Sequence, residues 1–156
     1  MTGKEGADMI IGIGNDHTAI ALKNEISEYL QALGHEVNDF GVNDDKSVDY
    51  PLIAEKTVVE IGKTIDVAVL ICGTGIGMSL AANKIKGIRA AVGSDCFSAK
   101  MAKAHNNCQV LCLGARTMGS ELAKMVVSEW LSAEFMGERH AKRVEMISRL
   151  ENGEKL

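Results

Sequence analysis

The sequence lacks the features that mark several protein classes. No apolar run approaches the ~20 residues of a membrane span, and no apolar segment of the secretory-signal type is present. The four cysteines form no CxxC pair and have no histidines at metal-ligand spacing, a pattern that supports neither a disulfide framework nor a zinc site. The formal net charge of -4 offers no broad basic surface for nucleic acid. We therefore expect a cytoplasmic protein without a metal, a membrane or a nucleic-acid partner.

What remains is the composition of an ordinary globular domain. Hydrophobic residues make up 46% of the 156 positions and charged residues 24%, which is enough apolar material for a core without staples. The polar opening at residues 1–8 is predicted to be a frayed leader. Residues 9–156 are predicted to form one domain, because they contain no linker, internal repeat or low-complexity tract.

Short β-type runs alternate with helical segments along the chain. Runs typical of strands occupy residues 9–14, 35–40, 67–72, 88–93 and 109–114. Helical spacing of apolar residues occupies 19–33, 51–63, 78–84, 97–105, 120–135 and 139–156. Apolar strands joined by helices pair in parallel with both faces of the sheet covered. The pattern predicts an α/β fold: a doubly wound, flavodoxin-like sheet of five parallel strands in the order 2-1-3-4-5, with helices on both faces and a C-terminal helix.

Two polar, glycine-bearing turns follow the first and third predicted strands. They read GNDH at 14–17 and CGTGIG at 72–77, and they lie side by side at the predicted switch point, where doubly wound folds bind ligands. The second turn lacks the Gly-Lys-Ser/Thr ending of a Walker A loop and misses the GxGxxG spacing. We expect its backbone N–H groups to bind an oxyanion or a phosphate. Cys72 either stands at its mouth as a thiolate favoured by a helix N-terminus, or is a small buried residue that ends the strand.

Several further motifs stand in order along the chain. With the two turns they are GNDH at 14–17, DYP at 49–51, ICGTGIG at 71–77, AANK at 81–84, GIRA at 87–90, AHNN at 104–107, LGAR at 113–116 and ERHAKRV at 138–144. Together they resemble the ribose-5-phosphate isomerase B family, which also includes galactose-6-phosphate and allose-6-phosphate isomerases. The resemblance implies an enzyme without metal or cofactor that interconverts an aldose phosphate and a ketose phosphate through an enediolate. It also implies a homodimer, or a dimer of such dimers, whose active sites draw residues from both chains.

The resemblance also assigns catalytic roles. Isomerisation needs a base, donors for the enediolate oxygen and, for a furanose, a group that opens the ring. Positions that match the family give these roles to Cys72 as base, to Thr74 with the N–H groups of Gly73, Gly75 and Gly77 as oxyanion donors, and to His105 in ring opening. Some relatives use a glutamate in the following loop as base, but this chain has Met78 and Leu80 there. From the residue pattern alone, His105 also suits the C-terminus of a helix.

Contacts to the sugar are implied in the same way. The matching residues are Asp16, Tyr50 and Asn106. The pattern alone allows Asp16 to cap the following helix and Tyr50 to pack at a helix start. One departure is Thr18-Ala19, where the family often has Ala-Gly or Gly-Gly after Asp-His. A larger residue there would trim the sugar pocket.

The phosphate anchor is predicted on the last helix. Arg139 and Arg143 stand four residues apart on one helical face, where like charges repel by roughly 0.2 to 0.5 kcal/mol. A bound dianion would reverse this repulsion, and the planar fork of arginine suits phosphate. His17, Arg116 and His140 match further family positions near the phosphate. The alternative is a terminal helix whose charges are simply solvated.

The resulting hypothesis is an isomerase that converts ribose 5-phosphate to ribulose 5-phosphate with a cysteine base. Allose 6-phosphate, galactose 6-phosphate and a four-carbon sugar phosphate are alternative substrates. A second alternative is a domain that senses a sugar phosphate without turnover. A sensor needs the arginines but not the base, so Cys72, Thr74 and His105 together favour the enzyme.

Overall fold

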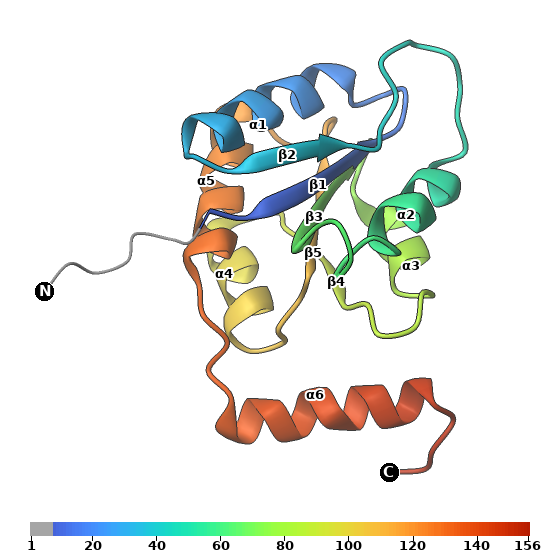
Figure 1. Cartoon of the computed structure of the whole chain (residues 1–156), viewed down its shortest axis with the longest axis vertical. Helices are drawn as coiled ribbons and strands as arrows, with labels where there is room; N and C mark the ends of the chain where they lie inside the picture. Colours follow the sequence, from blue (N-terminus) through green and yellow to red (C-terminus); the bar gives the residue numbers. More distant parts are fainter. Residues whose placement is uncertain (1–7) are drawn as a thin grey trace, which may run out of the picture.

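The computed structural model of the chain describes residues 8–156, so the predicted leader lies outside the described residues except for its last position. The predicted alternation of strands and helices is present in the described part (Figure 1). The elements are β1 (Ile10–Asn15), α1 (Ile20–Ala32), β2 (Glu36–Asp39), α2 (Tyr50–Val58), β3 (Val67–Cys72), α3 (Ile76–Ala82), β4 (Ala90–Val92), α4 (Cys96–Ala104), β5 (Val110–Gly114), α5 (Ser120–Ser132) and α6 (Glu138–Glu151).

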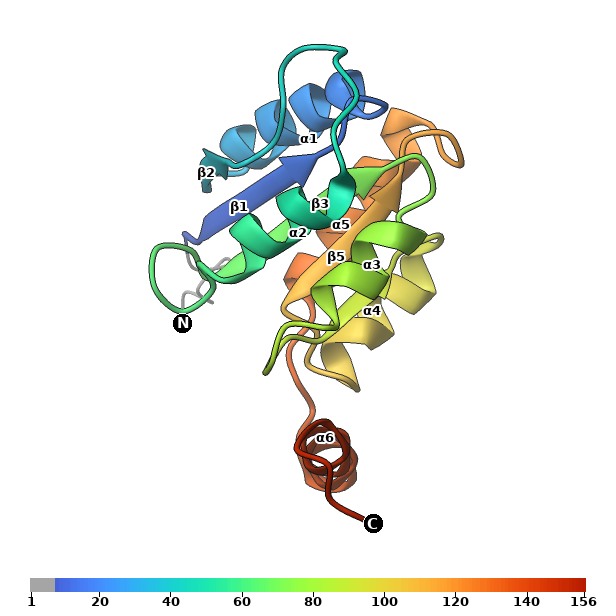
Figure 2. The ribbon, with the colours of Figure 1, turned by 90° about the vertical axis from the view of Figure 1, so that its right-hand side faces the viewer.

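A parallel five-stranded sheet lies between two layers of helices, which confirms the predicted fold class. Helices α1, α4 and α5 cover one face, and α2 and α3 cover the other (Figures 1 and 2). All six residues of β3 are buried, as expected of an apolar run in a strand covered on both sides. The largest fully buried side chain is Trp130 of α5, in the core of the first face.

The strand order differs from the predicted one at one edge of the sheet. β5 lies between β3 and β4, which gives the order β2-β1-β3-β5-β4, so the predicted order 2-1-3-4-5 is wrong in its last two strands. All five residues of β5 are buried, whereas the three residues of β4 are only half-buried, and a short strand of this kind suits a sheet edge. The correction places the loop after β5 directly beside the loop after β3.

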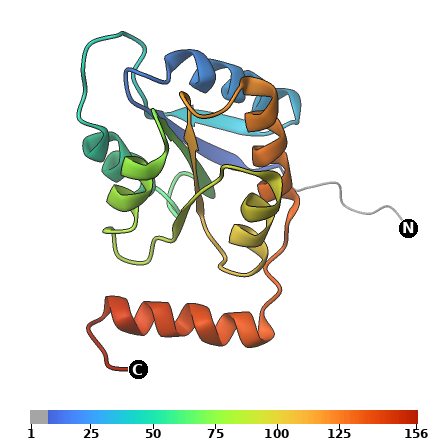
Figure 3. The same ribbon diagram turned by 180° about the vertical axis from the view of Figure 1, so that it is seen from behind.

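Helix α6 stands apart from the two helical layers, joined to α5 by residues 133–137 (Figures 1 and 3). Its one buried residue is His140. The side chains of Ile147 and Leu150, which belong to its predicted apolar stripe, are 45% and 56% exposed. Within the part of the chain that the structure describes, this stripe has little cover. In residues 8–156, none of the helices combines the length and apolar content of a bilayer crossing.

Candidate active site

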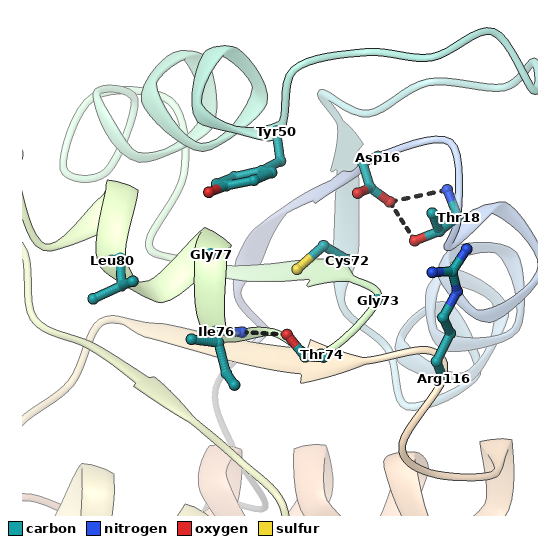
Figure 4. Close-up of a pocket in the computed structure, with 10 residues that line it drawn as sticks. All are labelled: Asp16, Thr18, Tyr50, Cys72, Gly73, Thr74, Ile76, Gly77, Leu80 and Arg116. Atoms are coloured by element: carbon teal, nitrogen blue, oxygen red, sulfur yellow. Dashed lines mark hydrogen bonds between the residues drawn. The ribbon is translucent and has the colours of Figure 1, made fainter.

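A cleft opens at the carboxyl ends of β1, β3 and β5, where the switch point predicted a ligand site (Figure 4). Its volume is about 420 Å³, which is within the range of small-molecule sites. The lining residues come from the loops after the three strands and from the first turns of α2 and α3. They are Asp16, Thr18, Tyr50, Cys72, Gly73, Thr74, Ile76, Gly77, Leu80 and Arg116.

Backbone hydrogen bonds hold the three loops together. The N–H of Asp16 donates to the carbonyl of Ile71 at 3.2 Å. The N–H of Ala115 donates to the carbonyl of Cys72 at 2.8 Å, and that of Arg116 to the carbonyl of Gly73 at 2.9 Å. These bonds continue the pairing of β1 and β5 with β3 beyond the strand ends. Arg116 thereby reaches the cleft, where it is the cationic residue of the lining.

Cys72 ends β3 with its sulfur directed into the cleft (Figure 4). The residue is only 5% exposed, and its Sγ accepts a hydrogen bond from the N–H of Gly75 at 3.2 Å. This donor fixes the position of the sulfur and places a partial positive charge against it. Gly75 has φ 77, and a Cβ there would lie 3.0 Å from the backbone carbon of Leu113, so the close turn around the sulfur requires glycine.

The other described cysteines offer less reactive thiols or lie elsewhere. Burial raises the pKa of Cys108 to about 11 and raises the pKa of Cys112 well above its usual range. Both side chains therefore stay protonated at neutral pH, as buried structural cysteines do. Cys96 is half-buried at the start of α4. In the described part of the chain, no three His, Cys, Asp or Glu side chains are grouped so as to hold a metal ion.

The loop after β3 and the first turn of α3 supply polar groups around the sulfur. The Oγ1 of Thr74 accepts a hydrogen bond from the N–H of Ile76 at 3.2 Å, which leaves its own proton available to a ligand oxygen. Gly77 is in the first turn of α3, where N–H groups have no intrahelical partner. A Cβ on Gly77 would lie 2.6 Å from the Cζ of Tyr50. The absence of that atom allows the tyrosine ring to pack across the start of α3.

One of the two carboxylate oxygens of Asp16 already has hydrogen-bond partners. It is 6% exposed, and its Oδ1 accepts from the N–H of Thr18 at 2.9 Å and from the hydroxyl of Thr18 at 2.6 Å (Figure 4). Helix α1 has Ala19 as its N-cap and no side-chain cap. The alternative role of Asp16 as the helix cap is therefore wrong, because its oxygen is used in a turn two residues long.

His17 lies beside the cleft rather than in its lining. Its Nδ1 accepts a hydrogen bond from the N–H of Val48 at 3.3 Å. The side chain of Asn15 binds the same segment between β2 and α2. Its Nδ2 donates to the carbonyl of Val42 at 3.0 Å, and its Oδ1 accepts from the Val42 N–H at 3.2 Å. Asn15 and His17 thus hold the segment between β2 and α2, which leads to Tyr50. A phosphate contact of His17 stays a prediction.

The remaining predicted site residues form a second group at the opposite end of the sheet, where the strands begin. Helix α4 runs between two parallel strands, so its C-terminus lies at the amino ends of the strands, near the start of β5. His105 is the C-cap of α4 and Asn106 follows it. Arg139, His140 and Arg143 lie on α6. None of the five lines the cleft in this chain.

The two histidines of this second group face each other. The rings of His105 and His140 stack with centroids 4.1 Å apart and an interplanar angle of 7°. Burial lowers the pKa of His140, and the nearby His105, Arg139 and Arg143 lower it further, against the opposite effect of Glu138. His140 is therefore neutral at neutral pH. Its Nε2 is buried without a hydrogen-bond partner among the described residues.

Three lining residues are absent from the set that the sequence predicts. The sequence pattern singles out Thr18 only as a departure from the family, although an Asp two positions before a Thr is typical of a side-chain-closed turn. Ile76 and Leu80 lie on one face of α3 and are 55% and 61% exposed. Apolar residues that stay exposed beside a polar cleft are typical of a surface covered by a ligand or another chain.

The chain is similar to proteins of known class along most of its length. Residues 11–147 match the family described as Ribose/Galactose Isomerase. Ribose-5-phosphate isomerase B of Escherichia coli is 45% identical over 142 residues, which are 90% of this chain and 95% of that protein. D-erythrulose-4-phosphate isomerase of Pectobacterium atrosepticum is also 45% identical, over 93% of this chain and 97% of that protein. The structure of Clostridium thermocellum ribose-5-phosphate isomerase B aligns with a TM-score of 0.91 and 46% identity, covering 93% and 99% of the two chains.

Proposed function

Since this chain belongs to the ribose/galactose isomerase family, we propose that it interconverts aldose and ketose phosphates, with ribose 5-phosphate and ribulose 5-phosphate as its substrate pair. The observation that carries the proposal is the Cys72 sulfur, held by the Gly75 N–H and directed into a cleft with Asp16 and Thr74. A binding domain has no need of a positioned thiol among hydroxyl-binding groups. The two matches cover 95% and 97% of those relatives, so the comparison takes in nearly all of each enzyme.

The reaction requires a proton to move between neighbouring carbons. In the proposed mechanism His105 assists opening of the furanose, and the Cys72 thiolate then removes the proton from C2 of the open aldose. Negative charge develops on O1, where the Thr74 hydroxyl and the Gly77 N–H are placed to stabilise it. The hydroxyl proton passes from O2 to O1, and the Cys72 thiol returns the carbon-bound proton to C1. Asp16 offers its Oδ2 to a sugar hydroxyl, because its Oδ1 is occupied by Thr18.

A complete site in this proposal needs two copies of the chain. The second group, which includes His105, Asn106 and the arginines of α6, lies at the amino ends of the strands, opposite the Cys72 cleft. The cleft itself contains the guanidinium of Arg116, which alone is a weak match for a phosphate dianion. A homodimer that places the second group of one chain over the cleft of the other supplies the missing cations. The exposed Ile147 and Leu150 of α6 are available to such an interface, and these dimers are free to pair further.

The alternatives are another sugar-phosphate substrate and a sensor without turnover. The relative from Pectobacterium atrosepticum is named for a four-carbon substrate at the same identity as the ribose enzyme of Escherichia coli, and Thr18 lines the cleft where a smaller residue would leave more room. Six-carbon aldose phosphates are further candidates because the family name includes galactose. A sensor without turnover is the other alternative. Sugar phosphates carry charge that keeps them from crossing bilayers, so we place the protein in the cytoplasm in each case.

A panel assay distinguishes these functions. Ketose formation is measured with ribose 5-phosphate, erythrose 4-phosphate, allose 6-phosphate and galactose 6-phosphate, and binding of each is measured in parallel by calorimetry. We expect the highest kcat/KM with ribose 5-phosphate. A higher value with another member reassigns the substrate, and tight binding without any turnover supports the sensor and contradicts the proposal.

His105 gives a second prediction. Because ring opening precedes the carbon chemistry, His105→Ala is expected to lower kcat/KM for ribose 5-phosphate by about 10²-fold, the lower end of the range for a lost acid–base group. The loss is expected to be under about twofold with erythrose 4-phosphate, whose phosphorylated O4 cannot close a furanose ring. Steady-state kinetics on the two substrates measure the difference. Equal losses on both would assign His105 to folding or to general binding.

A further inference from the structure

The turn that follows α4 has an unusual backbone and carries part of the second group. Asn107 has φ 48, a left-handed conformation that asparagine tolerates better than most residues. Its N–H donates to the carbonyl of Lys103 at 3.0 Å, and the N–H of Cys108 donates to the carbonyl of Ala102 at 3.0 Å, so two bonds satisfy carbonyls at the end of α4. This ending turns the chain sharply between His105 and the start of β5. The carbonyls of Asn106 and Asn107 lie beyond the helix and need donors from elsewhere.

Arg89, in the GIRA motif to which the proposed mechanism gives no role, supplies those donors. Its Nε donates to the carbonyl of Asn106 at 2.9 Å, and its Nη2 donates to the carbonyl of Asn107 at 3.0 Å. One rigid guanidinium thus holds two successive carbonyls from two fixed nitrogens, a fork that an ammonium group does not reproduce because all its donors are on one nitrogen.

Arg89 is itself fixed to the sheet. Its N–H donates to the Oε1 of Gln109 at 2.8 Å, and its carbonyl accepts from the N–H of Gln109 at 3.1 Å. Gln109 also donates from Nε2 to the carbonyl of Gly87 at 2.9 Å. The Arg89 guanidinium therefore fixes the turn after α4 relative to the starts of β4 and β5. It makes no direct bond to the ring of His105.

From this geometry we infer that Arg89 is a positioning residue for His105, which it aligns for ring opening by fixing the turn that follows it. The inference rests on the proposed function, which assigns ring opening to His105. One face of the His105 ring is covered by the stacked ring of His140. Arg89 thus fixes the turn next to His105, and His140 packs against the ring of His105.

A double-mutant cycle tests this inference. Arg89→Met keeps the length of the side chain and removes both donors, and Arg89→Lys keeps the charge but loses the fork. We expect Arg89→Met to lower kcat/KM for ribose 5-phosphate by about tenfold and for erythrose 4-phosphate by under about twofold, since small displacements of a catalytic group are costly only in the step that uses it. Arg89→Lys is expected to fall between this variant and the unmodified chain. In the His105→Ala background, Arg89→Met should cause no further loss.

Arg149→Met is the matched control, because Arg149 makes comparable bonds to Glu154 and Lys155 at the far end of α6. Thermal melting identifies any variant that loses its fold, in which case Arg89→Lys alone carries the cycle. Equal losses on both substrates, or additive losses of Arg89→Met and His105→Ala, overturn the inference and leave the proposed function intact. If His105→Ala itself spares ring opening, the assignment of His105 fails first and this inference fails with it.

Discussion

Replacing Cys72 with alanine is expected to lower kcat by about 10²- to 10⁴-fold, the range typical of a lost general base. The thiolate acts on a carbon-bound proton and contributes nothing to the phosphate anchor, so affinity for the product is expected to change little. Alanine also fits the site sterically, because the residue is small, ends a buried strand and makes one side-chain hydrogen bond. The fold is expected to persist.

Steady-state kinetics and calorimetry with ribulose 5-phosphate measure the two effects separately. Cys96→Ala is the matched control, because Cys96 starts α4 and lies outside the cleft. A Cys72→Ala enzyme with near-normal turnover would remove the thiol from the mechanism. A parallel loss of kcat and of product affinity would instead indicate that the loop after β3 had collapsed.

Alkylation provides an independent measurement of the same thiol. In a Cys96→Ser background, one equivalent of iodoacetamide is expected to inactivate the enzyme, and ribulose 5-phosphate is expected to protect it. Burial raises the pKa of Cys108 to about 11 and also raises that of Cys112, so both react slowly at neutral pH. Peptide mapping that finds the label on Cys108 or Cys112 in inactivated enzyme would contradict the assignment of Cys72.

The sequence pattern predicts the fold class because periodicity is a local property. The apolar runs at 67–72 and 109–114 identify two central strands, and the structure buries every residue of β3 and of β5. The order of β4 and β5 depends on which strands meet across the sheet, and no local pattern contains that information. Pairing is a tertiary choice that overrides local propensity.

The site, like the fold, has features that the sequence pattern predicts and features that it does not. The rule that ligands bind at the switch point locates Asp16 and Cys72 correctly in one cleft. The hydrogen bonds of Thr18 to Asp16, of Gly75 to the sulfur and of Arg89 to the turn after α4 depend on side-chain geometry. Residue spacing does not reveal such bonds. The separation of His105 from the cleft follows from the direction of α4, which the predicted topology already contained.

Arg143→Ala is expected to weaken kcat/KM for ribose 5-phosphate by roughly ten- to a hundred-fold, because a charge-assisted contact contributes about 1.5 to 3 kcal/mol. The kcat is expected to fall as well, since binding energy from the remote phosphate also positions the reacting carbons. Unphosphorylated ribose cannot use the anchor, so its low turnover should barely change. Arg149→Ala on the same helix is the control, because that residue pairs with Glu154 near the chain end.

The comparison of the two substrates separates binding from structure. Arg139 and Arg143 are exposed in the single chain, so their removal costs little in packing, and it relieves the repulsion between two like charges four residues apart on one helix. Melting temperature is therefore expected to stay the same or rise slightly. If turnover of ribose and of ribose 5-phosphate fall together, α6 is structural, and the phosphate assignment moves to Arg116 and His17.

The same variant also tests where the second group acts. In a mixed dimer of Cys72→Ala and Arg143→Ala chains, a shared site combines the intact cleft of one chain with the intact α6 of the other. One of the two sites is then unmodified, and the other carries both substitutions. Co-expressed chains with different affinity tags are expected to give purified mixed dimers with about half the activity of the unmodified enzyme, far above either parent.

If each site belonged to one chain, both sites of the mixed dimer would carry a substitution. Its activity would then be no more than the mean of the two parents, and α6 would have to reach the cleft of its own chain.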